Sequence, residues 1–163
     1  MSQEQSAAAG VTRAAADDDT DASAEQMQVL EFELGGERYC VDIDYVSEIV
    51  DRGSVTEVPN APEYVEGVMD LRGRTTSIVN PKTLLNVEND EEEAGRIVIF
   101  DASKFEDEAA VGWLVDEVFQ VIRVSMDDVE APPMERGDFI EGIVRRDDEL
   151  VVWISPTKTE SAA

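Results

Sequence analysis

Residues 64–81, YVEGVMDLRGRTTSIVNP, decide the fold of this chain. An apolar-rich run leads into an Arg-Gly-Arg turn centred on Gly73, and a second run leaves through Ile78 and Val79. Glycine adopts the positive φ of a tight turn without a steric penalty, and such turns join antiparallel strands. The stretch therefore predicts a β-hairpin with Gly73 at its tip.

This hairpin pattern occurs twice. Residues 139–156, FIEGIVRRDDELVVWISP, match residues 64–81 without a gap, a shift of 75 positions from Tyr64 to Phe139. The two tips differ, because the first reads Leu-Arg-Gly-Arg at 71–74 and the second Arg-Asp-Asp-Glu at 146–149. The chain therefore contains an internal repeat in which only the first copy has an apolar and basic tip.

The segments before each hairpin repeat as well. Alternating apolar and polar residues predict strands at 29–34 and 38–43, and matching strands at 96–100 and 111–115. Two sets of about five short strands predict a mainly β fold of paired small barrels. Each half has a marginal core, so we expect the barrels to pack on each other, with a groove between them lined by the segments that link strands two and three.

Three further local predictions follow from spacing and turn residues. Apolar residues three and four apart in 42–50 predict one or two helical turns capped by Asp42 or Asp44. Residues 55–58 predict a strand. A proline at position 81 predicts a short helix over 82–85, because proline fits the first helical turn.

Composition divides the chain. The following boundaries are expected: a disordered acidic tail at 1–27, a domain at 28–157 with a first barrel at about 28–87, an acidic connector at 88–95 and a second barrel at about 96–157, and a polar tail at 158–163.

The net charge of −25, from 38 acidic and 13 basic residues, limits the possible partners. Such a charge repels phosphate backbones and argues against nucleic-acid binding. An excess of carboxylates with little lysine also fits a protein kept soluble at high salt, so we expect a salt-loving source. The alternative, a calcium-binding protein, lacks support because no Asp-x-Asp-x-Asp-Gly loop occurs.

Nothing in the sequence predicts an active site or a cofactor. The chain has no histidine, so the usual catalytic triad is absent, and paired carboxylates are expected by chance in so acidic a protein. Cys40 is the single cysteine and is expected to be a buried apolar residue, as are Trp113 and Trp153. No apolar run is long enough to span a bilayer, and we expect a cytoplasmic protein without direct membrane insertion.

Arg72 is the strongest candidate for a protein contact. It is one of ten arginines in a strongly acidic chain and lies beside apolar Leu71 at the hairpin tip. Arginine at a partly apolar surface is a frequent interface anchor, although an internal salt bridge is the alternative. The apolar set that accompanies it admits two interpretations, core or groove lining; its members are Leu30, Ile43, Val46, Ile49 and Val118.

Five segments resemble, in order and spacing, the CheW family of chemotaxis adaptors: VLEFELGGERYCVDI, VSEIV, VPNAPEYVEGVMDLRGR, VGWLVDEVFQVIRV and FIEGIVRRDDELVVWIS. The resemblance spans about 29–156, and Gly-Val-x-x-Leu-Arg-Gly is its most specific element. It implies two intertwined five-stranded SH3-like β-barrels with short helices. It also implies a non-enzymatic adaptor that links the cytoplasmic tips of chemoreceptors to the regulatory domain of the histidine kinase CheA.

The resemblance also implies binding residues. A receptor-binding groove would be lined by Leu30, Ile43, Val46, Ile49 and Val118, with polar contacts from Glu48 and Arg72. Kinase binding would involve Gly67, Leu71 and Gly73. One departure bears on the groove, because Asp70 replaces the usual asparagine and adds a carboxylate beside Arg72.

Three other functions are weighed against this one. A CheV-like protein or a kinase regulatory-domain paralogue would share the fold. An oligonucleotide-binding barrel would need basic strands bearing aromatic residues, which is the opposite of this composition. A small hydrolase using carboxylates would lose activity on mutation of a single aspartate.

Overall fold

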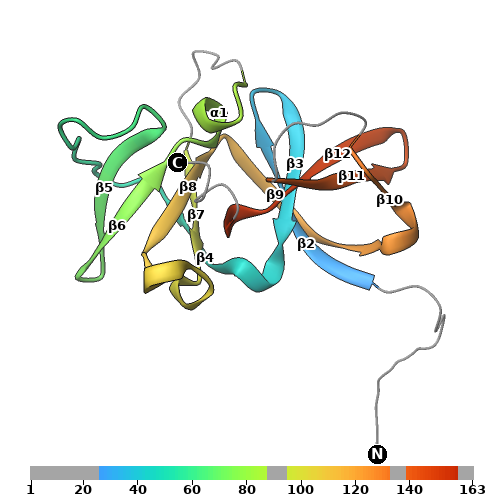
Figure 1. Ribbon diagram of the computed structural model, residues 1–163, viewed down its shortest axis with the longest axis horizontal. Helices are drawn as coiled ribbons and strands as arrows, with labels where there is room; N and C mark the ends of the chain where they lie inside the picture. Colours follow the sequence, from blue (N-terminus) through green and yellow to red (C-terminus); the bar gives the residue numbers. More distant parts are fainter. Residues whose placement is uncertain (1–25, 88–94, 133–138, 158–163) are drawn as a thin grey trace, which may run out of the picture.

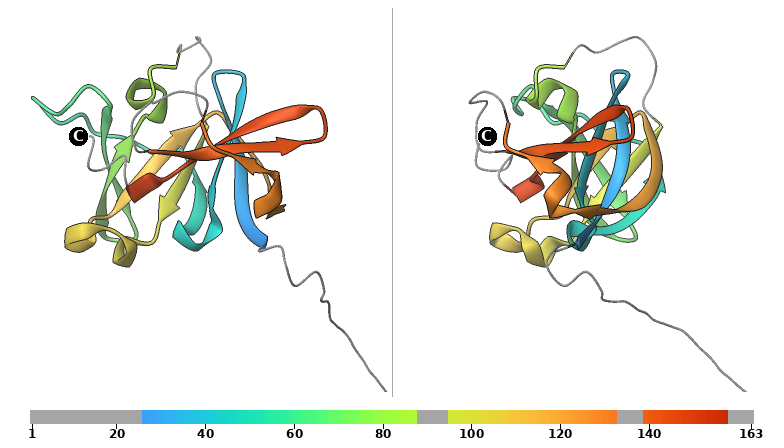
Figure 2. Two further views of the ribbon diagram at one scale, coloured as in Figure 1. Left: turned by 45° about the vertical axis from the view of Figure 1, so that its right-hand side comes forward. Right: turned by 90° about the vertical axis from the view of Figure 1, so that its right-hand side faces the viewer.

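The computed structural model describes residues 26–87, 95–132 and 139–157, which form two β-sheets side by side (Figures 1 and 2). The six-stranded sheet has the order β10-β11-β12-β3-β2-β9, and the five-stranded sheet β4-β7-β8-β6-β5. Their bounds are β2 (Gln26–Leu34), β3 (Glu37–Asp42), β4 (Val46–Asp51), β5 (Val65–Leu71), β6 (Arg74–Val79), β7 (Arg96–Phe100), β8 (Val111–Val115), β9 (Glu117–Ser125), β10 (Val129–Glu130), β11 (Ile140–Arg146) and β12 (Glu149–Ile154).

Helices are few and short. They are α1 (Pro81–Leu84) and the 3-10 turns η1 (Ile43–Tyr45), η2 (Ala102–Lys104), η3 (Glu106–Glu108) and η4 (Met126–Asp128). The mainly β fold with short helices is confirmed. Residues 1–25 of the expected acidic tail, the polar tail at 158–163 and most of the expected connector, at 88–94, lie outside the described residues. Residues 26 and 27, also assigned to the tail, instead begin β2.

The two sheets are intertwined. Strands β2 and β3 join β9 to β12, whereas β7 and β8 join β4 to β6, so each sheet combines two strands of one repeat with the later strands of the other. The parallel pairs β12–β3 and β6–β8 make this exchange. The ranges 28–87 and 96–157 therefore do not correspond to separate barrels. A half of about 60 residues buries too little surface to be stable alone, and the exchange joins both halves into one core.

Each sheet has a barrel-like shape without full pairing of its two edge strands, which a short stretch of chain connects instead. After β4 the chain crosses to the other edge, where Thr56 and Val68 exchange two backbone hydrogen bonds of 2.8 Å. In the other sheet β9 continues through η4 into β10, which pairs with β11. The strand predicted at 55–58 is wrong in extent, because only Thr56 forms a bridge there.

Three hydrophobic clusters hold the structure together. One lies inside each sheet, and the third, here called the inter-sheet core, joins the two sheets. Strand β7 contributes to two of them, because Ile97 faces its own sheet's interior and Val98 faces the inter-sheet core. The inter-sheet core comprises Leu30, Phe32, Leu34, Tyr39, Val41, Val98, Phe100, Phe105, Trp113, Val115 and Ile154. Burial of each large apolar side chain contributes about 1.5–3 kcal/mol.

Aromatic rings form the centre of the inter-sheet core. Trp113 of β8 packs edge-on against Phe100 of β7 and Phe32 of β2, with ring centroids 5.0 and 6.2 Å apart. Such edge-to-face pairs favour one arrangement of the rings. The predicted burial of both tryptophans and of Cys40 is confirmed.

The first hairpin tip has the turn that its sequence predicts. Leu71 pairs with Arg74, and the two residues between them, Arg72 and Gly73, have φ of 49° and 86°. Positive φ at both positions defines the two-residue turn that matches strand twist. The role of Gly73 is therefore confirmed, and Arg72 adopts a left-handed conformation as well.

The predicted helix at 42–50 is mostly wrong. Only Ile43–Tyr45 is helical, with Asp42 accepting a hydrogen bond from the backbone N–H of Asp44, and β4 follows at once. Pairing with β7 over five residue positions overrides the weak helical spacing. The short helix near 82–85 is confirmed as α1, where the Asn80 side chain caps the first turn.

Candidate protein-interaction groove

Four of the predicted groove residues lie together. Ile43, Val46, Ile49 and Val118 are partly buried and all pack against the inter-sheet core. They come from η1, from β4 of the five-stranded sheet and from β9 of the six-stranded sheet. Partly exposed apolar side chains at the junction of two sheets can bind an apolar partner surface. Their binding role remains a prediction.

A β-bulge in β4 determines how two of these side chains point. Val46 pairs with Phe100 and Glu48 with Ile99, so that Ser47 is an extra residue without a partner. Without the bulge, residues 46 and 49 would face opposite sides of the strand. With it, Val46 and Ile49 both face the inter-sheet core.

Leu30 departs from the predicted groove set. It lies in the middle of β2 between β3 and β9, and its side chain is fully buried in the inter-sheet core. Of the two interpretations, core or groove lining, the burial of Leu30 supports the core. Leu30 is a core residue beneath the partly exposed apolar side chains, and a receptor contact through it stays a prediction.

Arg72 and Glu48 form an ion pair at the edge of β4. The Arg72 side chain is 68% exposed and that of Glu48 is 29% exposed. The ion-pair partner of Arg72 within the described residues is thus Glu48, not its neighbour Asp70. The predicted internal ion pair is present, most of the Arg72 side chain is still exposed, and its role as an interface anchor stays a prediction.

The three predicted kinase-contact residues have different environments. Gly67 is buried at a bulge of β5 with φ of 150°, and a Cβ there would lie 2.2 Å from the carbonyl oxygen of Thr56. Leu71 is partly buried against the core of the five-stranded sheet, and Gly73 is exposed at the tip. Gly67 therefore allows the close approach of the chain at Thr56 to β5, and its role in kinase binding stays a prediction.

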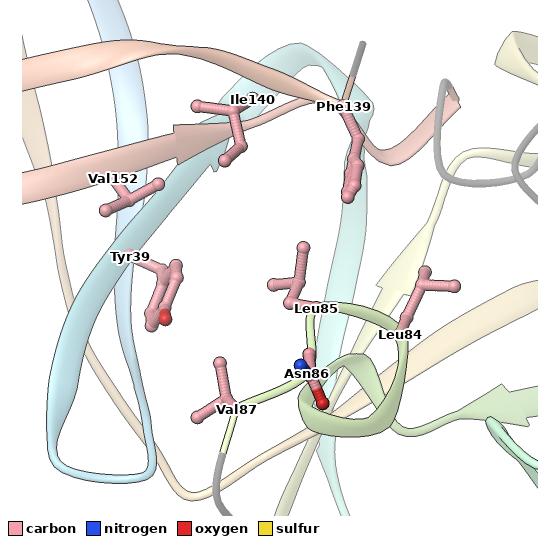
Figure 3. A pocket seen from close by; sticks show the side chains of 8 residues that line it. All are labelled: Tyr39, Leu84, Leu85, Asn86, Val87, Phe139, Ile140 and Val152. Atoms are coloured by element: carbon pink, nitrogen blue, oxygen red, sulfur yellow. The ribbon is translucent and has the colours of Figure 1, made fainter. Parts of the chain in front are cut away.

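A separate cavity of about 410 Å³ lies on the α1 side of the molecule (Figure 3). Its lining comes from β3, β12, the end of α1 with the segment after it, and the start of β11 with the residue before it; the residues are Tyr39, Leu84, Leu85, Asn86, Val87, Phe139, Ile140 and Val152. Burial, and then the charge of Glu37, raises the pKa of Tyr39, so its phenol stays protonated at neutral pH. Sequence reasoning missed this cavity, because no motif marks residues brought together only by packing.

The described residues give no sign of reactive chemistry. Burial, and then the charge of Glu31, raises the pKa of Cys40 to about 12, which leaves its thiol protonated and unreactive. Residues 26–87, 95–132 and 139–157 contain no group of His, Cys, Asp or Glu side chains placed to hold a metal ion. None of the helices in these same ranges has the length and apolar character to cross a bilayer.

Comparison with known proteins agrees with this architecture. The family model for the CheW-like domain matches residues 28–162. The chemotaxis protein CheW of Treponema pallidum is 33% identical over a match that covers 85% of this chain and 84% of the relative. The chemotaxis protein CheW of Thermotoga maritima is 28% identical over a match that covers 82% of this chain and 87% of the relative. The crystal structure of the scaffolding protein TtCheW from Thermoanaerobacter tengcongensis is 29% identical, covers 83% of this chain and 88% of that one, and superposes with a TM-score of 0.73. The chain therefore belongs to the CheW family of chemotaxis proteins.

Proposed function

We propose that this protein is a non-enzymatic adaptor that binds the cytoplasmic tips of chemoreceptors and the regulatory domain of the histidine kinase CheA. Membership of the CheW family and the scaffolding role named for its solved relative support this proposal. One observation in the structure carries it: partly exposed apolar residues of both sheets pack against the inter-sheet core, and β4, which supplies two of them, also carries Glu48, the ion partner of Arg72.

Receptor binding occurs in the groove lined by Ile43, Val46, Ile49 and Val118. An α-helix with an apolar stripe fits such a strip, and a few buried anchors dominate the affinity of helix-in-groove complexes. Arg72 adds a directional hydrogen-bond donor, because its guanidinium has five N–H groups and only one described ion-pair partner, Glu48.

Kinase binding occurs at the β5–β6 hairpin. Gly73 and the outer part of Leu71 lie at its tip, while Gly67 keeps the hairpin in place from inside. Strand β4, which carries Val46 and Ile49 of the groove, and strand β5 of this hairpin are the two edge strands of the same sheet. An adaptor that couples receptor state to kinase activity needs both surfaces to favour one common arrangement.

Co-sedimentation and titration with a receptor cytoplasmic fragment and with the CheA regulatory domain test the proposal. The wild-type protein should bind both, and Val46→Glu and Arg72→Ala should each weaken receptor binding at least tenfold while leaving kinase binding in place. Asp147→Ala, in the turn of the other hairpin, is the control and should bind both partners normally. Unchanged receptor binding by both groove variants would contradict the groove assignment.

A further inference from the structure

We propose that the cavity on the α1 side of the molecule binds a small neutral molecule that is apolar over most of its surface and carries one hydrogen-bonding group, such as a hydroxyl or a carbonyl. The lining includes none of the groove residues and none of the hairpin residues named above. The inference therefore goes beyond the proposed function and does not rest on it. The feature that carries it is one largely buried hydroxyl, that of Tyr39, in an otherwise apolar wall.

The walls of the cavity come from elements that follow both sheets. Tyr39 of β3 pairs with Val152 of β12, so the two side chains lie on one face of the six-stranded sheet. Leu85 and Val87, from the segment after α1, complete the wall (Figure 3). Tyr39 belongs to the inter-sheet core, and the other three residues pack against it. Packing of the protein itself thus holds the walls in place, as in most small-molecule sites, which are largely formed before the ligand binds.

The volume of the cavity limits the size of the ligand. At about 410 Å³, it falls within the range of pockets that hold small molecules, roughly 300–1,000 Å³. An apolar cavity of about 150 Å³ is large enough for one benzene ring. The cavity therefore suits a molecule of about two fused rings.

Tyr39 supplies the hydrogen-bonding group of the site. The residue is only 8% exposed, and its ring stacks on Phe32 with centroids 6.2 Å apart, which fixes the direction of the phenol. Within residues 26–87, 95–132 and 139–157 its hydroxyl has no hydrogen-bond partner. A largely buried hydroxyl without a protein partner favours a ligand that brings an oxygen or nitrogen to it, because the missing hydrogen bond costs free energy.

The lining also determines the charge of the ligand. The other polar side chain is Asn86, which is exposed and follows α1 in a left-handed conformation with φ of 61°. The described residues that line the cavity include no lysine, arginine, aspartate or glutamate. A charged ligand would lose its hydration without gaining an ion partner, and the net charge of −25 would also repel an anion. The site therefore selects a neutral molecule.

Titration of the full chain with three bicyclic probes tests this assignment. 2-Naphthol carries one hydroxyl, naphthalene lacks it, and 2-naphthoate has a charged carboxylate in its place. The protein should bind one molecule of 2-naphthol. It should bind naphthalene severalfold more weakly, because the Tyr39 hydroxyl then stays without a partner, and 2-naphthoate at least tenfold more weakly. Bound 2-naphthol should also raise the melting temperature, since the ligand binds only the folded state.

Two variants place the probe in the cavity. Tyr39→Phe removes the hydroxyl and keeps the ring, so it should lower the affinity for 2-naphthol to that for naphthalene and leave naphthalene binding unchanged. Tyr64→Phe, outside the lining, is the matched control and should bind all probes as the wild type does. Val152→Phe adds atoms to the wall and should weaken 2-naphthol and naphthalene at least tenfold. Tyr39→Phe decides the outcome by itself if Val152→Phe does not fold.

The outcomes separate this inference from the proposed function. Absence of saturable 2-naphthol binding, or an unchanged 2-naphthol affinity in Tyr39→Phe, overturns the inference and leaves the adaptor function intact. If 2-naphthoate binds as tightly as 2-naphthol, the probes bind at a cationic surface elsewhere and the assigned site is wrong. If no probe binds while Val152→Phe loses the kinase domain, a side chain of that partner occupies the cavity and the inference fails.

Discussion

The Nζ atom of Lys82 lies 2.8 Å from Oδ1 of Asp116, and the two side chains are only 3% and 13% exposed. Lys82 belongs to α1, which follows β6 of the five-stranded sheet. The other oxygen of Asp116 accepts a hydrogen bond of 2.7 Å from the backbone N–H of Gly35, in the turn between β2 and β3 of the six-stranded sheet. One carboxylate thus joins an element of each sheet.

Removing the lysine should destabilise the fold. Lys82→Met leaves a buried carboxylate without its ion partner, which typically costs about 3–5 kcal/mol. Urea unfolding followed by tryptophan fluorescence measures the change. Arg145→Met is the control, because its ion pair with Glu130 is more than half exposed and should contribute less than about 1 kcal/mol. Equal losses in the two variants would show that the Lys82–Asp116 pair has no special role.

Gly67, at the bulge of β5, offers a test of how the chain at Thr56 packs on this strand. Gly67→Ala places a methyl group 2.2 Å from a backbone oxygen of Thr56, in a backbone conformation that L-residues avoid. We expect a loss of about 2–4 kcal/mol in the free energy of unfolding. Gly95→Ala, where nothing lies within 4 Å, should change it by less than about 0.5 kcal/mol. A stable Gly67→Ala protein that fails only in kinase binding would support this glycine as a direct contact.

Arg72→Ala separates stability from binding. Its ion pair with Glu48 is exposed on the arginine side, so its loss should cost less than about 1 kcal/mol. Receptor-fragment affinity should nevertheless fall at least tenfold. Thermal unfolding and a binding titration on the same sample give both values. A large drop in melting temperature would mean that Arg72 acts through the structure of the groove rather than through its partner.

Cys40 should report global unfolding. An ordinary thiol ionises near pH 8.5, whereas burial raises the pKa of Cys40 to about 12. The native state therefore favours the protonated thiol, whereas the unfolded chain ionises it at lower pH. The contribution of the buried thiol to the free energy of unfolding is complete below about pH 8.5 and is lost as the pH rises towards 12. At pH 8 the native protein should resist a thiol reagent that labels it at once in urea, and Cys40→Ala should lose less stability between pH 9 and 11. Rapid labelling of the native protein would contradict the burial of this thiol.

Salt should stabilise the protein. With a net charge of −25, like-charge repulsion opposes the compact state, and raising the ionic strength from about 0.1 to 1 M shortens the screening length from roughly 10 to 3 Å. The melting temperature should rise with KCl over this range. A flat or falling curve would argue against a protein adapted to high salt.

Sequence reasoning was most successful where the signal was local. Three such features depend on neighbours in the chain, and the structure has them where expected: the hairpin turn at Gly73, the matching hairpin at 139–156 and the short helix that begins at Pro81. The helix at 42–50 failed because its spacing is also compatible with a strand that contains a bulge. An extra residue shifts the alternation of side chains between the two faces of the strand by one position, and no residue type in the sequence indicates such a bulge.

The sequence by itself determined a duplicated, mainly β chain of the CheW family, with buried tryptophans and a basic tip on the first hairpin only. Only the tertiary structure decided that the halves exchange strands, that Leu30 is core while Val121 is exposed, and that Gly67 serves barrel closure. The physical reason is that the pattern of the sequence shows which side chains are apolar, whereas the burial of each side chain depends on which strands lie beside its own strand. Leu30 and Val121, for example, are paired with each other although they belong to different repeats and lie 91 positions apart in the chain.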